Sequence, residues 1–379
     1  MPPPLVTRRV LAHPSLSQTT SKLLATKRLA SCISPLITVN IRQMATMVAP
    51  AVSSAPASST EVPNAATQTI DLTSTLKTLS ASANEPVHVK ADLSYYNGTK
   101  DGSKPWTKQY PDPEWKGKGL PTNAVFKEHH LPIFDLRPLV DAGREDLTTT
   151  DVTGFQVVPK RFSKTHMQYD EWNDENTIKT KYYNEVETLL KNVTGASKVI
   201  IFDHTIRKAE PVGQETLDTP DNRKPVSFTH VDQTPASGTA RVLRHAGQQE
   251  GERLLKGRAQ LINVWRPLRG PVLDFPLAYA DARTLNKKSL IPSDLLYEDR
   301  KGETLQVEFS DQHRWYYLSS MQPDEAVLLK CWENTVDGQG GNPTPHTAFV
   351  DERYFNQPGV ELRQSIEIRA LVFHESEQQ

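Results

Sequence analysis

The sequence predicts an α+β, mainly-β protein, in which a sandwich or barrel of strands carries helices to one side. Two observations indicate this class. Strand-like and helical segments alternate from residue 86 to about residue 210, whereas short apolar runs typical of strands dominate from about residue 211 to residue 375. No internal repeat is visible along the chain.

The first folded segments are short strands followed by a helix. Residues 86–96 (PVHVKADLSYY) alternate like a strand, and the turn-forming residues NGTKDGSKPW follow. Residues 129–139 and 153–162 are two further short apolar runs. Between residues 171 and 195, apolar residues recur at three- and four-residue spacing, acidic residues come early, and Gly195 marks the end. This pattern predicts a helix.

The remaining segments have mostly strand character. Residues 197–207 (SKVIIFDHTIR) form an apolar run typical of a buried strand. A second helix is expected over residues 238–256, which are charged and punctuated by leucines. The other expected strands are residues 226–232, 259–268, 313–320, 326–334 and 363–373.

The N-terminal 85 residues are expected to lie outside the fold, as a leader followed by a linker. No acidic side chain precedes Glu61, and the leader mixes Arg, Lys, Ser and Leu, the composition of a mitochondrial transit peptide. The alternative is a disordered leader with Met44 or Met47 as the working start, which would leave the protein in the cytoplasm. Residues 48–69 are rich in Ala, Ser and Pro and predict a disordered linker. We therefore expect a single domain over residues 86–379.

The composition excludes several classes of protein. The formal net charge is −1, so no global field attracts nucleic acid or an anionic membrane. Only two cysteines occur, Cys32 and Cys331, which excludes a disulfide framework and a cysteine-based metal cluster. No apolar run approaches the ~20 residues of a membrane-spanning helix. Phosphate-binding loops and the nucleophile-elbow motif are also missing.

The segment VSFTHVDQTPASG contains a candidate pair of metal ligands. In a strand over residues 226–232, His230 and Asp232 lie on the same face, because side chains alternate between faces. A histidine nitrogen and a carboxylate oxygen two residues apart can occupy neighbouring positions on one metal ion. Two histidines and one carboxylate are the usual ligands of non-haem Fe(II) oxygenases. The alternative is a strand that ends in a polar turn.

A third ligand would have to come from a later strand. The candidates are His245, His313, His346 and His374. His346 is favoured because it stands where a Gly/Pro-rich loop ends and a short apolar stretch begins, at the entrance to a strand. His313 suits a surface or aromatic-packing position equally well, and His374 lies almost at the terminus.

The last expected strand carries a polar face. Alternation places Arg363, Ser365, Glu367 and Arg369 together on one side of RQSIEIRALVF. This face either belongs to an edge strand and meets water, or it lines a cavity. In a cavity, an arginine and a serine two apart can hold a carboxylate, as they do for the cosubstrate of 2-oxoglutarate oxygenases.

Several motifs together resemble the fungal AsaB-type hydroxylase/desaturase family, which includes gibberellin desaturase and CmcJ-like proteins. They are HVDQT, NVWRPLRGPVLDFPLAYAD, SSMQPDEAVLLKCWEN, PHTAF and RQSIEIRALVF, with LPIFDLRPL and GFQVV in the N-terminal part. The resemblance extends from about residue 86 to about residue 373. It is specific in its combination of motifs rather than in any one of them.

The resemblance implies a double-stranded β-helix (jelly-roll) core with flanking helices. It also implies Fe(II)- and 2-oxoglutarate-dependent hydroxylation or desaturation of a small secondary metabolite, with O2 consumed and succinate and CO2 released. His230, Asp232 and His346 match the family's metal ligands, and Arg363 with Ser365 matches its cosubstrate clamp. The spacing from His346 to Arg363 is longer than in plant-type oxygenases, so residues 350–362 must form a loop.

Alternatives remain at several positions. Arg369 is a second candidate for the clamp, and Arg266 is a third basic candidate for the cosubstrate or the substrate. Trp265, Trp315, Tyr316 and Trp332 could line the substrate pocket or belong to the core. The alternative functions are a non-catalytic jelly-roll protein that binds a small molecule or a partner enzyme, and a zinc-dependent hydrolase. Hydrolysis has no need of a cosubstrate clamp, which argues against the hydrolase.

Overall fold

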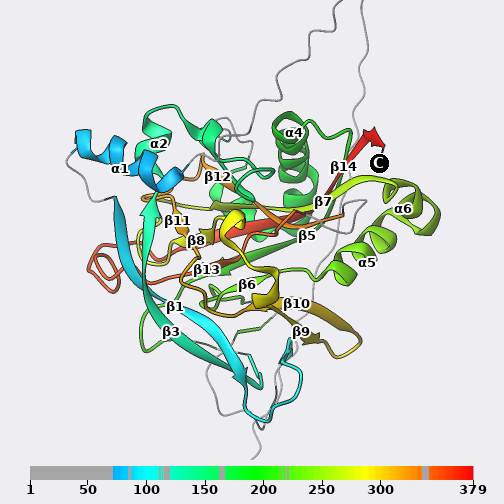
Figure 1. Ribbon diagram of the computed structural model, residues 1–379, viewed down its shortest axis with the longest axis horizontal. Coiled ribbons are helices and arrows are strands. Elements are labelled where there is room, and N and C mark those ends of the chain that lie inside the picture. Colours follow the sequence, from blue (N-terminus) through cyan, green and yellow to red (C-terminus); the bar gives the residue numbers. More distant parts are fainter. Residues whose placement is uncertain are drawn as a thin grey trace, which may run out of the picture. The chain divides into compact units, whose positions relative to one another are not determined.

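The strands assemble into two sheets, shown in the computed structural model of Figure 1. The structure describes residues 71–378 except 84–86, 111, 113, 115–119, 161, 163–166, 215, 217, 220–221 and 335–340. The described residues belong to one unit, Thr67–Gln379. The leader and the linker are predicted for residues 1–85, of which residues 1–70 and 84–85 lie outside the described residues.

The strands are β1 (His88–Thr99), β2 (Trp106–Lys108), β3 (Ala124–Asp135), β4 (Phe155–Val158), β5 (Lys198–Lys208), β6 (His230–Val231), β7 (Gly257–Pro267), β8 (Leu277–Ala280), β9 (Leu290–Leu296), β10 (Lys301–Val307), β11 (Trp315–Tyr317), β12 (Ala326–Glu333), β13 (His346–Ala348) and β14 (Gln364–Gln378). The helices are α1 (Leu72–Ala83), α2 (Arg137–Asp141), α3 (Glu175–Thr177), α4 (Tyr183–Thr194), α5 (Pro235–Ala246) and α6 (Gln248–Leu254). Shorter helical turns are η1 (Glu145–Leu147), η2 (Tyr169–Asn173), η3 (Ile178–Tyr182), η4 (Ala282–Thr284) and η5 (Lys287–Ser289).

The two sheets form the expected jelly-roll core. One has the order β1-β3-β11-β8-β13-β6-β10-β9-β2, and the other has the order β4-β12-β7-β14-β5. In the second sheet, β14 lies between β7 and β5 and pairs antiparallel with both. The expectation of a mainly-β, α+β fold with flanking helices is confirmed.

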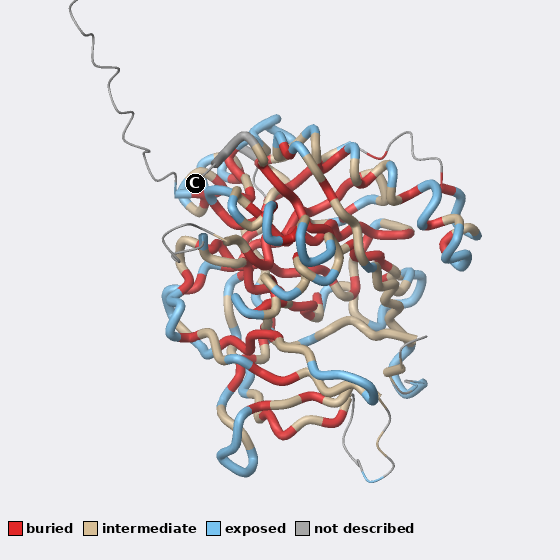
Figure 2. The backbone as a smooth tube through the Cα atoms, turned by 90° about the vertical axis from the view of Figure 1, so that its right-hand side faces the viewer, coloured by how far each residue is buried: buried red, intermediate tan, exposed pale blue. Residues whose placement is uncertain are grey.

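Alternation along β7 shows how the five-stranded sheet is covered on both faces. Leu261 and Trp265 belong to one apolar cluster, whereas Ile262 and Val264 belong to a second cluster that also contains Val186 of α4. Helix α4 therefore covers the outer face of this sheet, and the other face is turned into the fold. Figure 2 shows the buried residues running through the interior of the fold, with exposed residues mostly toward its periphery.

Both predicted helices are present, but each is divided into shorter helical segments. The helix expected over residues 171–195 is a succession of η2, α3, the π-helical turn η3 and α4, and it ends at Gly195, whose φ is 72°. The helix expected over residues 238–256 is divided into α5 and α6 at Gly247, whose φ is 82°. A positive φ of this kind is readily adopted by glycine.

Two expectations are wrong in extent. The strand expected over residues 226–232 is reduced to β6, His230–Val231, because the residues before it form only an isolated bridge, between Phe228 and Ser94. The folded part also does not begin near residue 86. Helix α1 precedes it and buries Leu72 and Leu76 in the main apolar cluster.

Candidate metal centre

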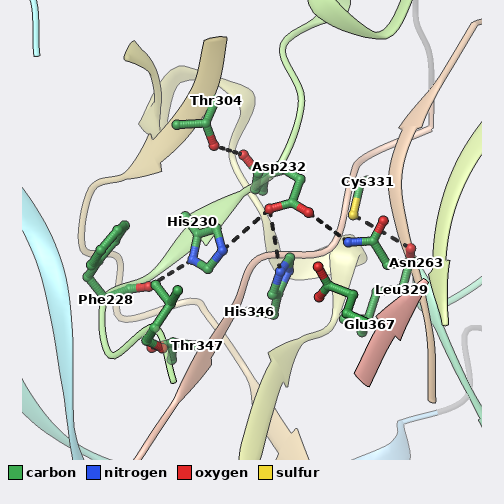
Figure 3. Close-up of polar contacts among 12 residues, drawn as sticks. Phe228, His230, Asp232, Asn263, Thr304, Leu329, Cys331, His346, Thr347 and Glu367 are labelled. Carbon is green, nitrogen blue, oxygen red and sulfur yellow. Dashed lines mark hydrogen bonds and ion pairs between the residues drawn. The ribbon is translucent and has the colours of Figure 1, made fainter. Parts of the chain in front are cut away.

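His230, Asp232 and His346 converge at one place in the fold (Figure 3). His230 is in β6, Asp232 follows that strand directly, and His346 begins β13, where it pairs in register with His230. One ligand atom from each side chain lies within 4.8 Å of the other two. The pairing of β6 with β13 therefore joins residues that are more than a hundred positions apart in the sequence.

Backbone carbonyl groups orient both imidazole rings. Nδ1 of His230 donates to the carbonyl oxygen of Phe228 at 2.9 Å, and Nδ1 of His346 donates to that of Thr344 at 3.1 Å. With Nδ1 protonated, Nε2 carries the free lone pair in the neutral ring. The two Nε2 atoms lie 3.5 and 4.0 Å from Oδ1 of Asp232, so the three lone-pair-bearing atoms face a common point.

The second carboxylate oxygen of Asp232 is held from the other side. Oδ2 accepts a hydrogen bond from Nδ2 of Asn263 at 2.7 Å and lies 3.4 Å from Nε of Arg369. Burial opposes ionisation of Asp232, but the close contact with the ring of His230 and the positive charge of Arg369 outweigh burial and hold the pKa of Asp232 well below its usual value. Asp232 is therefore an ionised acceptor whose orientation is fixed by its neighbours.

The protonation states suit a divalent cation. Burial lowers the pKa of His346, and the neighbouring His230 acts in the same direction, so His346 is neutral at pH 7. Neutral imidazole nitrogens and an ionised carboxylate are ligands that Fe(II) accepts, and three ligands leave other coordination positions open. Hydrogen bonds from ligands to the surrounding chain are a regular feature of metal sites.

Helix α5 fixes the chain immediately after Asp232. Thr234 caps the helix by accepting a hydrogen bond from the backbone nitrogen of Ser237 at 3.0 Å, and Pro235 occupies its first turn. Gly238 lies so close to β12 that a Cβ atom there would be 2.4 Å from the ring of Trp332. The turn that carries Asp232 is therefore held between a capped helix and a sheet.

A cavity of about 2100 Å³ opens beside His230 and Asp232, whereas His346 is buried behind them and does not line it. The walls of the cavity come from β5, α5, β9, β10 and residues 223–228, and His230, Asp232, Arg207, Arg241 and Arg369 line it. Binding sites for drug-sized ligands occupy roughly 300–1,000 Å³. The cavity can therefore hold a small cosubstrate together with a larger organic molecule.

The polar face of β14 is turned into the fold and not toward water. Arg363, Ser365 and Glu367 are 2%, 1% and 7% exposed, which excludes the edge-strand alternative. Nε of Arg363 donates to Oγ of Ser365 at 3.2 Å, Nη1 donates to the carbonyl oxygen of Phe275 at 2.9 Å, and the guanidinium stacks over Trp265. Among the described residues, no carboxylate forms an ion pair with this guanidinium.

Arg369 has the opposite surroundings. Besides Asp232, its guanidinium contacts Asp203 at 3.0 Å and Glu367 at 2.9 Å. Burial opposes its charge, but the surrounding carboxylates outweigh burial and raise the pKa of Arg369. Its donors are already occupied by acidic side chains of the protein.

Arg266, the third basic candidate for binding the cosubstrate or the substrate, does not lie at the metal centre. Arg266 points away from the metal centre and is enclosed by the rings of Phe162, Trp172 and Tyr182, with its guanidinium carbon 4.3 Å from the Phe162 centroid. It cannot reach a cosubstrate at the centre, because successive residues of β7 face opposite sides of the sheet and Trp265 faces inward.

The remaining histidines and aromatic residues are structural. His245 stacks on Phe202, His313 accepts or donates a hydrogen bond with the hydroxyl of Tyr95, and His374 does so with Gln260. Trp265, Trp315, Tyr316 and Trp332 are buried in the apolar clusters and do not line the large cavity, so the structure favours the core alternative for these four residues.

Sequence reasoning missed Asn263, Glu367 as a neighbour of the ligands, and Arg207. Asn263 is completely buried in the apolar run of β7, and an amide isolated among apolar residues was the available signal. Figure 3 shows Glu367 beside His346. Arg207 could be assigned to the cavity only once the pairing of β5 with β14 was known.

Comparisons with known proteins relate the chain to a family of oxidoreductases and to fungal biosynthetic enzymes. A family model described as "Oxidoreductase/YMDC permease-like domain" matches residues 93–373. Aspirochlorine biosynthesis protein N of Aspergillus oryzae is 43% identical over 150 residues, which are 38% of this chain and 60% of that protein. The Fe(II)/2-oxoglutarate-dependent dioxygenase nvfI of Aspergillus novofumigatus is 33% identical over 254 residues, covering 66% of this chain and 85% of the relative.

A solved structure supports the fold over a greater length. The iron and alpha-ketoglutarate-dependent endoperoxidase NvfI superposes with a TM-score of 0.62 at 26% sequence identity, covering 76% of this chain and 98% of that chain. A jelly-roll core with two histidines and an aspartate at one point defines the class of non-haem iron oxygenases. The chain belongs to the family matched over residues 93–373, and it is an Fe(II)/2-oxoglutarate-dependent dioxygenase of the fungal hydroxylase/desaturase type.

In the part of the chain that the structure describes, no helix is both long enough and apolar enough to cross a membrane.

Proposed function

We propose that His230, Asp232 and His346 hold Fe(II), and that the enzyme hydroxylates or desaturates a small secondary metabolite. The observation that carries this assignment is the convergence of two Nε2 atoms and Oδ1 of Asp232 on one point, where His230 and Asp232 line a large cavity. When bound, Fe(II) with 2-oxoglutarate and O2 supplies the oxidising chemistry, and succinate and CO2 are released. The chain itself contributes the ligands, their orientation and the enclosed surroundings.

Arg363 and Ser365 are the better candidates for the far carboxylate of 2-oxoglutarate. A buried guanidinium without an acidic partner is costly, and a ligand carboxylate would offset that cost with charge-assisted hydrogen bonds. Arg369 already has Asp203, Asp232 and Glu367 around it, so a further anion would meet carboxylates as well as the guanidinium. We assign Arg369 to the positioning of Asp232 instead.

The substrate enters the cavity from the side walled by α5, β5 and β10. The lining of the cavity contains cations as well as apolar and aromatic side chains, including Phe202 of β5, Phe228 before β6 and Tyr297 after β9. Such a lining suits an organic scaffold with polar substituents. Removal of bulk water from the cavity by the substrate would strengthen the electrostatic contacts around Asp232.

The test is formation of succinate from 2-oxoglutarate by purified protein with Fe(II), ascorbate and a panel of terpenoid, polyketide and amino-acid-derived compounds. We expect Asp232→Ala to abolish succinate formation and Fe(II) binding, because it removes the only anionic ligand. His130→Ala is the matched control, since His130 is exposed on β3 and pairs with Asp92 far along the sheet. Full turnover in Asp232→Ala would overturn the assignment.

A further inference from the structure

Arg207 lies beside the Arg363–Ser365 pair on the neighbouring strand. It is the second-last residue of β5, and it is paired in register with Ser365 of β14. Directly opposed residues of an antiparallel ladder project from the same face, with their Cβ atoms roughly 5 Å apart. Arg207 therefore projects to the same side as the inward face of β14, and it lines the large cavity.

The hydrogen-bonding capacity of Arg207 is largely unused. Nη1 donates to the carbonyl oxygen of Lys224 at 2.9 Å. Within the described segments, its guanidinium forms no ion pair with an aspartate or a glutamate. This differs from Arg223 and Arg369 of the same cavity, which pair with Asp218 and with several carboxylates, respectively.

Two cations without acidic partners thus lie on adjacent strands. Burial, followed by the positive charge of Arg207, lowers the pKa of Arg363 to about 9. Burial also lowers the pKa of Arg207, although Glu367 opposes this effect. Placing one carboxylate between the two guanidinium groups would remove their repulsion and satisfy donors on both, which is the arrangement that favours a bound anion.

We propose that Arg207 is a second binding residue for the far carboxylate of the 2-oxo acid cosubstrate. Arg207, Arg363 and Ser365 form a cradle that selects a dicarboxylate over a 2-oxo acid without the second carboxylate. This inference rests on the proposed function, since it requires the cosubstrate to extend from the metal ligands toward the start of β14. An anionic group on the substrate is the competing occupant for Arg207.

The experiment measures anaerobic binding of two ligands to Fe(II)-loaded protein by calorimetry. The ligands are 2-oxoglutarate and 2-oxopentanoate, which has a methyl group in place of the far carboxylate. We expect Arg207→Gln to weaken binding of 2-oxoglutarate about ten- to hundred-fold, as for loss of a charge-assisted hydrogen bond. Binding of 2-oxopentanoate should be unchanged, which also shows that the variant is folded.

Two control variants separate a direct contact from a general effect of charge. Arg207→Lys keeps the charge and should recover part of the lost affinity. Arg244→Gln removes an exposed cation of α5 that lines the same cavity, and it should leave both affinities unchanged. Equal losses for the two ligands in Arg207→Gln, or no loss for either, would overturn the inference.

The outcomes also distinguish this inference from the proposed function. One outcome is that the wild-type protein binds 2-oxoglutarate with an affinity that Arg363→Gln lowers and Arg207→Gln does not. In that case Arg363 binds the far carboxylate as proposed, and Arg207 binds a different anion. If the wild-type protein loaded with Fe(II) does not bind 2-oxoglutarate, the proposed function fails, and the inference fails with it.

Discussion

Replacing Asn263 by leucine tests whether the surroundings of Asp232 tune the metal site. Nδ2 of Asn263 donates to Oδ2 of Asp232 at 2.7 Å, and the amide is completely buried. A hydrogen bond to a charged group contributes about 1.5–3 kcal/mol, and about 1.4 kcal/mol corresponds to a factor of ten in affinity. We therefore expect Asn263→Leu to weaken Fe(II) binding about ten- to hundred-fold, the range typical of residues that orient metal ligands.

The stability of this variant should change little. Oδ1 of Asn263 has no hydrogen-bond partner among the described residues, so leucine also removes a buried acceptor that is unsatisfied. Leucine is close to asparagine in size and suits the surrounding apolar cluster. A loss of metal affinity at nearly constant free energy of unfolding would show that the effect acts through Asp232.

The assay is an anaerobic titration of metal-free protein with Fe(II) in competition with a chelator. Gln260→Leu is the matched control, because Gln260 is a buried amide of the same strand that contacts His374 and not the metal ligands. Its Fe(II) affinity should equal that of the wild-type protein. An unchanged affinity in Asn263→Leu would show that this hydrogen bond does not hold Asp232 in place for the metal.

Three further predictions follow from other contacts. Arg363→Gln should raise the KM for 2-oxoglutarate at least about ten-fold by loss of a charged hydrogen bond, whereas an unchanged KM would move the clamp to Arg369. Leu76→Ala should lower the free energy of unfolding by about 2–5 kcal/mol, because Leu76 is fully buried; urea denaturation showing no change would contradict the docking of α1. His313 has its pKa lowered by burial from 6.5 to about 4, so the native state loses stability as the pH falls through this interval. Denaturation curves should show a loss of about 2 kcal/mol from this group near pH 5, absent in His313→Phe, and equal pH dependence of the two proteins would contradict it.

Local patterns predicted the elements of the site but not their environment. Alternation correctly grouped Arg363, Ser365, Glu367 and Arg369 on one face of a strand. Whether that face meets water or a cavity depends on the pairing of β14 with β5 and β7, and these partners lie far away in the sequence. The periodicity of a single segment does not show which distant strands it pairs with. The sequence alone could therefore not exclude an edge strand.

At the metal centre, too, local patterns identified the residues but not the contacts between them. His230 and Asp232 were identified from their spacing, although the strand expected to carry them is only two residues long. The two side chains still lie together, because Asp232 directly follows β6 and its Oδ1 is 3.5 Å from Nε2 of His230. His346 was favoured by its place at the start of a strand. Its register with His230 depends on tertiary structure, which the sequence pattern does not show.

Helix α1 was missed because its composition resembles the preceding linker. Residues 72–83 (LTSTLKTLSASA) are rich in Ser, Thr and Ala, but leucines at 72, 76 and 79 have helical spacing. Leu72 and Leu76 are buried against the main cluster, so tertiary packing and not composition stabilises this helix.

The most direct test of the central claim is the stoichiometry of Fe(II) bound to metal-free protein under anaerobic conditions, measured for the wild type, His346→Ala and His130→Ala. We expect one Fe(II) per chain in the wild type and in His130→Ala, and greatly weakened binding in His346→Ala, whose imidazole faces Asp232 with Nε2. One tightly bound Fe(II) per chain in His346→Ala, or none in the wild type, would contradict this expectation.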